Sequence, residues 1–167
     1  MAGNDDQIAY WNGPTGEKWA RFQERMDANL AEPSEAALAL AAPRPGERVL
    51  DIGCGAGSTS RALAALVGPT GHVTAVDVSR PLLDQARSQP NPANLDFLEA
   101  DAATHPFAAD HDLLFSRFGV MFFDQPVAAL AHLRGSLKPS GRLAFVCWRP
   151  AAENEWVTLP LGVAKTL

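Results

Sequence analysis

The chain has 167 residues, enough for one ordinary domain with a sizeable hydrophobic core. Hydrophobic residues make up 47% and charged residues 20%, which excludes a disordered chain, and the longest aliphatic stretch, AALALAA, is far too short to span a membrane. With a formal net charge of -5 and no basic cluster, the chain is not predicted to bind nucleic acid, whose phosphates require grouped Lys and Arg.

The N-terminal sequence and the cysteines bear on the compartment. The first ten residues, MAGNDDQIAY, are polar and acidic and lack the basic and apolar regions of a signal peptide. Cys54 and Cys147 are therefore expected to be reduced and buried rather than bridged. Nucleophile chemistry at Cys54 is a weak alternative, because no histidine is close in sequence. We predict a cytoplasmic protein.

The N-terminal part of the chain predicts two helices. An amphipathic helix over 14–32 is indicated by apolar residues at helical spacing, namely Trp19, Phe22, Met26 and Leu30. A second helix begins near Ser34 and covers SEAALALAA, until APRPGER interrupts it.

Strands and helices then alternate along the chain. Strands are predicted for RVLDIG, HVTAVDV, NLDFLEAD, DLLFSRF and RLAFVCW, and helices for STSRALAALV, SRPLLDQARSQ and QPVAALAHLRGSL, the last ended by KPSG. Ser79 is expected as an N-cap, with Pro81 in the first turn after it. This alternation predicts an α/β fold, with a parallel sheet, right-handed crossovers and helices on both faces.

The fold places the ligand site before any family is considered. In such sheets ligands bind outside the carboxyl ends of the strands. That rule brings the glycine-rich loop together with Asp77, Asp101 and Ser116, each near the end of a predicted strand.

The stretch VLDIGCGAGSTS combines three glycines with an acid, and this combination restricts the ligand. Gly53, Gly55 and Gly57 form GxGxG, which lacks the lysine of a P-loop and differs from the dinucleotide pattern GxGxxG. A diphosphate at the following helix N-terminus would also be repelled by Asp51. A nucleoside with a cationic amino-acid tail fits better, and S-adenosylmethionine is such a ligand. Asp77, about 20 residues further on, is suited to accept hydrogen bonds from a ribose; helix capping is its alternative role.

These residues resemble those of class I S-adenosylmethionine-dependent methyltransferases, in particular the small-molecule group similar to the ubiquinone and menaquinone methyltransferases. The resemblance covers residues 10–160, and its motifs are VLDIGCGAGSTS, VTAVDVS, FLEADA, DLLFSRFGVMFFDQP and LRGSLKPSGRLAFVCWRP. It implies a Rossmann-like fold and a methyltransferase that uses S-adenosylmethionine and a small-molecule acceptor, with no metal.

The resemblance also implies roles for individual residues. Asp51 would anchor the methionine amino group, and Gly53, Gly55 and Gly57 would line the methionine tail and the ribose. Asp77 would accept the ribose hydroxyls and Val78 would pack on adenine, while Asp101 and the backbone N–H of Ala102 would contact the adenine polar atoms. Ser116 and Arg117 would contact the methionine end and face the acceptor. For Asp101 and Ser116 the alternative is strand-end turn chemistry.

Further residues are implied around the acceptor. The segment YWNGPTGEKWARFQERMD resembles the family's lid, in which Trp11 and Trp19 would close over the sulfonium. Trp19 has the alternative of facing the core. Trp148 and Arg149 would line the acceptor pocket, with packing as their alternative role.

No histidine is predicted to be a general base. His72 and His111 precede their strands and lie at the wrong edge of the sheet, and His132 is expected to be solvated on its helix. His105 lies on the correct side but nearer the adenine end. Methyl transfer needs a base only if the acceptor loses a proton, so the catalytic residues stay unassigned.

The family pattern has seven strands, of which this chain supplies five. We therefore expect the order 3-2-1-4-5, without the last two strands, and a division into a lid region (1–33), a cofactor-binding core (34–150) and the start of a substrate cover (151–167). The fifth strand would be an apolar edge, so we expect the chain either to be C-terminally truncated or to complete its sheet with another chain, such as a second copy. Two alternatives to the enzyme are a chain that binds S-adenosylmethionine without turnover and, less favoured, an NAD-dependent oxidoreductase.

Overall fold

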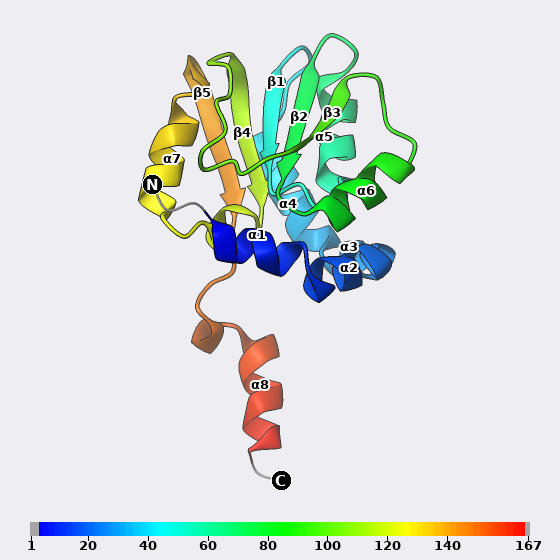
Figure 1. Ribbon diagram of the computed structural model, residues 1–167, viewed down its shortest axis with the longest axis vertical. Helices are drawn as coiled ribbons and strands as arrows, with labels where there is room; N and C mark the ends of the chain where they lie inside the picture. Colours follow the sequence, from blue (N-terminus) through cyan, green and yellow to red (C-terminus); the bar gives the residue numbers. More distant parts are fainter. Residues whose placement is uncertain (1–3, 166–167) are drawn as a thin grey trace.

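Five parallel strands form one sheet in the order β3-β2-β1-β4-β5, as the computed structural model shows for residues 4–165, the part of the chain that it describes (Figure 1). The strands are β1 (Arg48–Ile52), β2 (His72–Asp77), β3 (Leu95–Glu99), β4 (His111–Arg117) and β5 (Leu137–Val146). All five predicted strands and their order are confirmed. Residues 1–3 and 166–167, at the ends of the predicted lid and cover segments, lie outside the described part.

Helices cover both faces of this sheet, as the alternating pattern predicted. They are α1 (Asp5–Trp11), α2 (Pro14–Arg21), α3 (Gln23–Asn29), α4 (Ala31–Ala41), α5 (Ser58–Val67), α6 (Arg80–Ser88), α7 (Pro126–Arg134) and α8 (Glu155–Ala164), with 3-10 turns η1 (Val120–Phe122) and η2 (Ala151–Glu153). Helices α4, α5 and α6 contribute to one buried apolar cluster, and α7 contributes Leu133 to the other. None of the helices within 4–165 has the length and hydropathy needed to cross a bilayer.

The N-terminal region differs from the prediction. The single helix expected over 14–32 is divided into α2 and α3 at Phe22, whose φ of -106° and ψ of 22° leave the helical region, and α4 already begins at Ala31. Helix α1 was not predicted at all. Together α1, α2 and α3 lie across the carboxyl ends of the strands (Figure 1).

Three local predictions need correction. Ser79 occupies the N-cap position of α6, but its hydroxyl donates to the Trp11 carbonyl oxygen at 2.7 Å instead of capping the helix. The KPSG segment, predicted to lie before the fifth strand, belongs to β5, which begins at Leu137. Its pairing with β4 is irregular between His111 and Leu113. Cys147 is exposed, whereas Cys54 is buried as expected.

The end of the chain extends away from the sheet. Strand β5 is the edge strand, pairs with β4 and exposes 52% of Leu143. Beyond it, η2 and α8 project from the body of the molecule (Figure 1). Pairing of this edge with a second copy stays a prediction.

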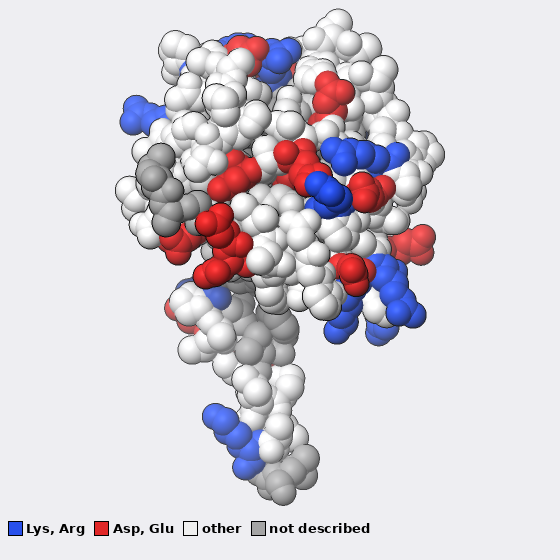
Figure 2. All heavy atoms as spheres, in the orientation of Figure 1, with Lys and Arg blue, Asp and Glu red and all other residues white. Residues whose placement is uncertain are grey.

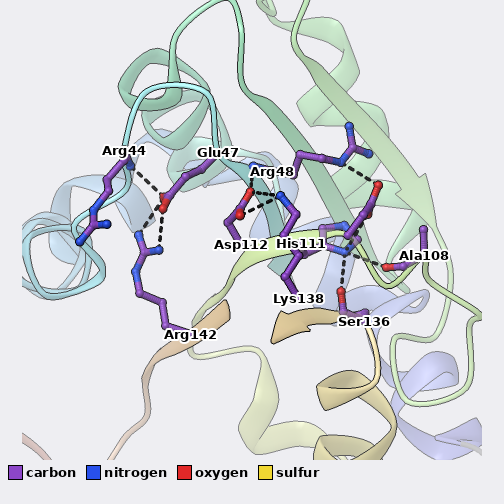
Figure 3. Close-up of polar contacts among 10 residues, drawn as sticks. Arg44, Glu47, Arg48, Ala108, His111, Asp112, Ser136, Lys138 and Arg142 are labelled. Carbon is purple, nitrogen blue, oxygen red and sulfur yellow. Dashed lines mark hydrogen bonds and ion pairs between the residues drawn. The ribbon is translucent and has the colours of Figure 1, made fainter. Parts of the chain in front are cut away.

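A network of charged side chains joins the amino ends of β1 and β4 to β5 and α4 (Figure 3). Arg142 donates to both Glu47 carboxylate oxygens at 2.7 and 2.8 Å, and to the carbonyl oxygens of Ala41 and Ala42 at the end of α4. Lys138 donates to Asp112 at 2.8 Å, and Asp112 also accepts the Arg48 backbone N–H. These bonds hold the edge strand and α4 in place at the rim opposite the ligand site.

Replacing Arg142 should destabilise the fold and change its response to acid. Hydrogen bonding from Arg142 holds the pKa of Glu47 below its ordinary 4.5, so the pair stabilises the folded state above that pH and this contribution is lost as pH falls below it. In Arg142→Met we expect a free energy of unfolding lower by about 1–2 kcal/mol at pH 7 and a smaller difference from wild type at pH 3, measured by urea denaturation.

The matched control is Arg149→Met, which removes an exposed ion pair with Glu153. Its effect should stay within about 0.5 kcal/mol. Equal unfolding free energies for the two variants would contradict the structural role given to Arg142.

Candidate functional site

A cavity of about 330 Å³ opens at the carboxyl ends of the strands, beneath α1, α2 and α3. This volume lies in the range of small-molecule sites. Its wall combines the glycine loop, the ends of β2 and β4, and side chains of the N-terminal helices. The sheet geometry thus places the cavity where the topology rule predicted it.

The glycine loop is held tightly against its neighbours. The backbone N–H groups of Gly53 and Cys54 donate to the Val76 carbonyl oxygen at 2.8 and 3.1 Å. Gly53 has a φ of 68°, and a Cβ added there would lie 2.6 Å from the Cα of Gly119. Only glycine combines this dihedral with this close approach, which brings bare backbone to the cavity wall.

Asp51 lies behind the loop and is fully buried. Its Oδ2 accepts hydrogen bonds from Ser60 at 2.6 Å and Thr59 at 3.0 Å, both in the first turn of α5. Its Oδ1 is buried without a hydrogen-bond partner in the described part of the chain. Burial raises the pKa of Asp51 to about 6, against the lowering effect of the two hydroxyls. A protein carboxylate therefore already occupies the start of α5.

Asp77 lines the cavity and also shapes it. Its Oδ2 accepts the Gly55 backbone N–H at 2.7 Å, and its Oδ1 accepts that of Ser79 at 2.8 Å. Burial raises its pKa, while these backbone hydrogen bonds lower it. The carboxylate thus connects the end of β2 to the loop and to the start of α6, so the capping alternative describes part of its role.

The predicted adenine end carries an unexpected contact. Val78, Asp101 and Ala102 line the cavity, as expected. Asp101 accepts a hydrogen bond from the Asn4 side chain at 2.9 Å, and Asn4 in turn accepts the Asp124 backbone N–H at 2.8 Å. Asn4 therefore fastens the start of α1 to the rim, which no sequence motif indicated.

Two tryptophans of the lid face the cavity. Trp11 and Trp19 both line it and meet edge to face, with ring centroids 5.8 Å apart. Trp11 also packs against Phe122 at 5.3 Å. The aromatic lid segment is therefore folded over the cavity, and Trp19 faces the site rather than the core.

Four expected contacts lie outside the cavity lining, and Asp51, behind the loop, is one of them. The Ser116 hydroxyl donates to the Ile52 carbonyl oxygen at 2.7 Å and accepts two backbone N–H groups at the start of η1, so it serves the turn, as its alternative reading had it. Gly57 leaves room for the Phe97 ring, which would lie 2.7 Å from an added Cβ. Arg149 pairs with Glu153 on the surface.

Arg117 and Trp148, predicted for the acceptor side, both line the cavity. Trp148 stacks on Phe118 with ring centroids 4.4 Å apart, and Phe118 has an unusual φ of 61°. Arg117 donates to the Ser34 hydroxyl at 2.8 Å and lies 3.6 Å from Oδ1 of Asp27. Asp27 also lines the cavity and was missed by the sequence reading. Its signal was the spacing of Trp19, Gln23 and Asp27, which would place all three on one face of the helix predicted over 14–32; all three line the cavity although the helix breaks at Phe22.

Histidine positions agree with the sequence reading except at one point. His72 and His111 begin β2 and β4, far from the cavity. His132 was expected to be solvated, but its Nε2 lies 2.7 Å from the His105 carbonyl oxygen in a partly buried position. None of the histidines lines the cavity in the part that the structure describes. Cys54 does line it, but burial raises the pKa of its thiol well above the usual value, which keeps the thiol protonated.

Residues 49–141 match the sequence pattern of the methyltransferase domain family. The chain belongs to that family. The match includes the glycine loop and the ends of β2, β3 and β4, whereas the cavity-lining residues of α1, α2 and α3 and Trp148 lie outside it.

Two curated relatives each match more than three fifths of the chain. The ubiquinone/menaquinone biosynthesis C-methyltransferase UbiE of Ectopseudomonas mendocina is 37% identical over 111 residues, which is 64% of this chain and 43% of the relative. The aklanonic acid methyltransferase DauC of Streptomyces sp. strain C5 is 36% identical over 107 residues, which is 62% of this chain and 49% of the relative. This chain therefore spans less than half the length of either relative.

Solved structures show the same fold. A SAM-dependent methyltransferase from Aquifex aeolicus superposes with a TM-score of 0.65 at 26% identity, covering 95% of this chain and 86% of that one. A chain of the complex between the Haloferax volcanii Trm112 methyltransferase activator and a methyltransferase superposes with a TM-score of 0.73 at 24% identity. The superposition covers 86% of this chain and 66% of that one. Both confirm the Rossmann-like arrangement.

The tight contact at Gly53 predicts a specific sensitivity. In Gly53→Ala the new Cβ would combine left-handed backbone strain with a clash against backbone, so we expect a loss of about 2–4 kcal/mol in the free energy of unfolding. Gly46→Ala is the matched control, because Gly46 also has a positive φ of 83° and an added Cβ would meet only the Thr70 hydroxyl oxygen, at 3.6 Å. That variant should lose only about 1–2 kcal/mol, from backbone strain alone. Equal losses in thermal denaturation would show that the clash is absent.

Proposed function

We propose that this chain binds S-adenosylmethionine in the cavity and transfers its methyl group to a small-molecule acceptor. Membership of the methyltransferase domain family and the names of the relatives support this activity. The observation that carries the proposal is the buried carboxylate of Asp51, with one unpartnered oxygen, beneath the glycine loop.

The residues present fit this cofactor. The ammonium group of the methionine tail is a partner for Asp51 across the bare loop of Gly53 and Gly55. Asp77 and Asp101 have lone pairs left for the ribose hydroxyls and the adenine amino group. When bound, the cofactor supplies a methyl group already activated on a sulfonium, so the protein needs chiefly to position the acceptor and to exclude water.

The lid would complete this environment. Trp11 and Trp19 close the cavity over the position proposed for the sulfonium, where an aromatic face contributes about 0.5–2 kcal/mol of cation–π attraction. Arg117 and Trp148 then remain on the side proposed for the acceptor. The division into lid (1–33), core (34–150) and start of a cover (151–167) is part of the same proposal.

A dinucleotide fits this arrangement less well. Its diphosphate would take the start of α5, where Ser60 and Thr59 already donate to Asp51. A second anion there would be repelled by a carboxylate in a poorly solvated position. The electrostatics therefore favour a cationic ligand over NAD.

The proposal also covers the methyl acceptor, the cellular compartment and the association of two copies of the chain. The relatives are named for ubiquinone and menaquinone biosynthesis and for aklanonic acid, which supports a small organic acceptor. Acidic side chains gather over α1, which carries Asp5 and Asp6, on the face shown in Figure 2, and this supports a partner other than nucleic acid. We infer a cytoplasmic protein that pairs with a second copy through the β5 edge.

Calorimetry separates the proposal from its alternatives. We expect S-adenosylmethionine and S-adenosylhomocysteine to bind and NADH not to bind, followed by methyl transfer to a panel of quinols. Binding without transfer to any acceptor would favour a binding module. Uptake of NADH with no response to the sulfonium compound would overturn the proposal.

The pH dependence of cofactor affinity tests Asp51. Because burial raises its pKa to about 6, the carboxylate becomes neutral below that pH and loses its attraction for an ammonium group. The dissociation constant should therefore rise about fivefold as pH falls from 6 to 5, and approach about tenfold per pH unit below pH 5. In Asp51→Asn we expect weaker binding at pH 7 and a flatter profile, with the residual slope due to Asp77. Asp84→Asn, an exposed change on α6, should keep the wild-type slope.

A further inference from the structure

The acceptor side of the cavity contains two opposite charges that the cofactor assignments leave unused. Asp27 comes from α3 in the lid, and Arg117 is the last residue of β4. Both line the cavity, and their side chains expose only 27% and 13% of their surface. Charged groups of this kind are expected to be fully paired when they are withdrawn from water.

The pairing of Asp27 is incomplete. Its Oδ2 accepts a hydrogen bond from the Gln23 side-chain amide at 2.6 Å. Its Oδ1 is buried without a hydrogen-bond partner in residues 4–165, and the guanidinium of Arg117 remains 3.6 Å away. That distance is too long for a hydrogen bond, so one lone pair of the carboxylate is left for a donor.

The surroundings of Asp27 strengthen its interaction with a hydrogen-bond donor. The cavity that Asp27 and Arg117 line is also lined by apolar side chains, namely Met26, Leu30, Phe118, Met121 and Trp148. Two cations act on Asp27, Arg117 from β4 and Arg61 from α5, while α4 contributes the neutral hydroxyl of Ser34. In so apolar a site, a proton acceptor beside a fixed cation can both remove a proton and stabilise the anion that remains.

We propose that Asp27 accepts the proton of an acidic hydroxyl, phenolic or enolic, on the acceptor, and that Arg117 stabilises the resulting oxyanion. This rests on the function proposed above and names its substrate class. The acceptor O–H bond breaks and its proton passes to Oδ1 of Asp27. The acceptor oxygen then forms the bond to the methyl carbon, while the methyl–sulfur bond breaks and its electron pair stays on sulfur. Asp27 returns the proton to water when the lid opens.

The test compares two phenols of different acidity, 4-nitrophenol and the less acidic 1-naphthol, in single-turnover methyl transfer by the full chain. With 1-naphthol, Asp27→Asn should lose at least about 100-fold in rate at pH 7 and recover about tenfold per pH unit as the probe ionises. With 4-nitrophenol above its own pKa, the loss should be less than about fivefold. Glu24→Gln, an exposed change on the same helix, should match wild type with both phenols.

A measurement without turnover examines Arg117. In the presence of S-adenosylhomocysteine, bound 4-nitrophenol should show the absorbance of its phenolate at a pH below the pKa of the free phenol. Arg117→Met should abolish this spectral change and Arg117→Lys should keep part of it. Asp27→Glu retains a carboxylate and should therefore keep more 1-naphthol activity than Asp27→Asn. It also provides a second variant for the test in case Asp27→Asn folds poorly.

The outcomes separate this inference from the proposed function. A wild-type chain that takes up no S-adenosylmethionine would overturn the proposed function itself. If the cofactor binds but neither phenol is methylated, or if Asp27→Asn reduces transfer to both phenols equally at every pH, the role of Asp27 is overturned and the proposed function stands. If Asp27→Asn reduces transfer to both phenols equally and also weakens cofactor binding, Asp27 and Arg117 hold the lid in place and take no part in proton transfer.

Discussion

The placement of one buried carboxylate constrains the rest of the site. Asp51 lies under the glycine loop and is held by the hydroxyls of Ser60 and Thr59 in the first turn of α5. A charge in this position is costly to bury, which the raised pKa of the group expresses. The cost is offset only in part within the protein, because Oδ1 lacks a partner among the described residues. A cationic ligand, as proposed above, would complete the compensation.

Several polar contacts, together with the packing of Trp11 on Phe122, attach the proposed lid to the rim. Asn4 joins Asp101 to the Asp124 backbone, Asn12 joins the Val78 carbonyl oxygen to the Arg80 N–H, and the Ser79 hydroxyl reaches the Trp11 carbonyl oxygen. Such bonds contribute about 1 kcal/mol each, far less than a packed core would. A segment held in this way can open at modest cost, and ligand-binding segments are commonly drawn from this less stable part of a fold. The same lid carries Trp11, Trp19 and Asp27, so its opening would expose the cofactor and acceptor positions together.

Most of the sheet was predictable because local patterns determine it. Each strand is a short apolar run with turn signals on both sides, and the alternation with amphipathic helices requires parallel pairing. The glycine loop, Asp77 and Asp101 follow from the rule that strand ends share one rim. The errors lie where the chain leaves that pattern. The break at Phe22 and the existence of α1 depend on docking against the rim. Ser116 was assigned to the cofactor because its place at a strand end is visible in the sequence, whereas its bonds to Ile52, Gly119 and Val120 are not.

The sequence by itself determined the fold class, the strand order and the family, since these depend on periodicity and glycine spacing, and the carboxylate close to the loop is the basis for proposing a cationic ligand. Only the tertiary structure decided which side chains line the cavity and which polar atoms are left without partners. Asp27 and Arg117 are 90 residues apart along the chain, and no local pattern relates them. They meet because α3 folds over the end of β4, and whether a carboxylate oxygen is buried and unpartnered depends on everything that packs around it.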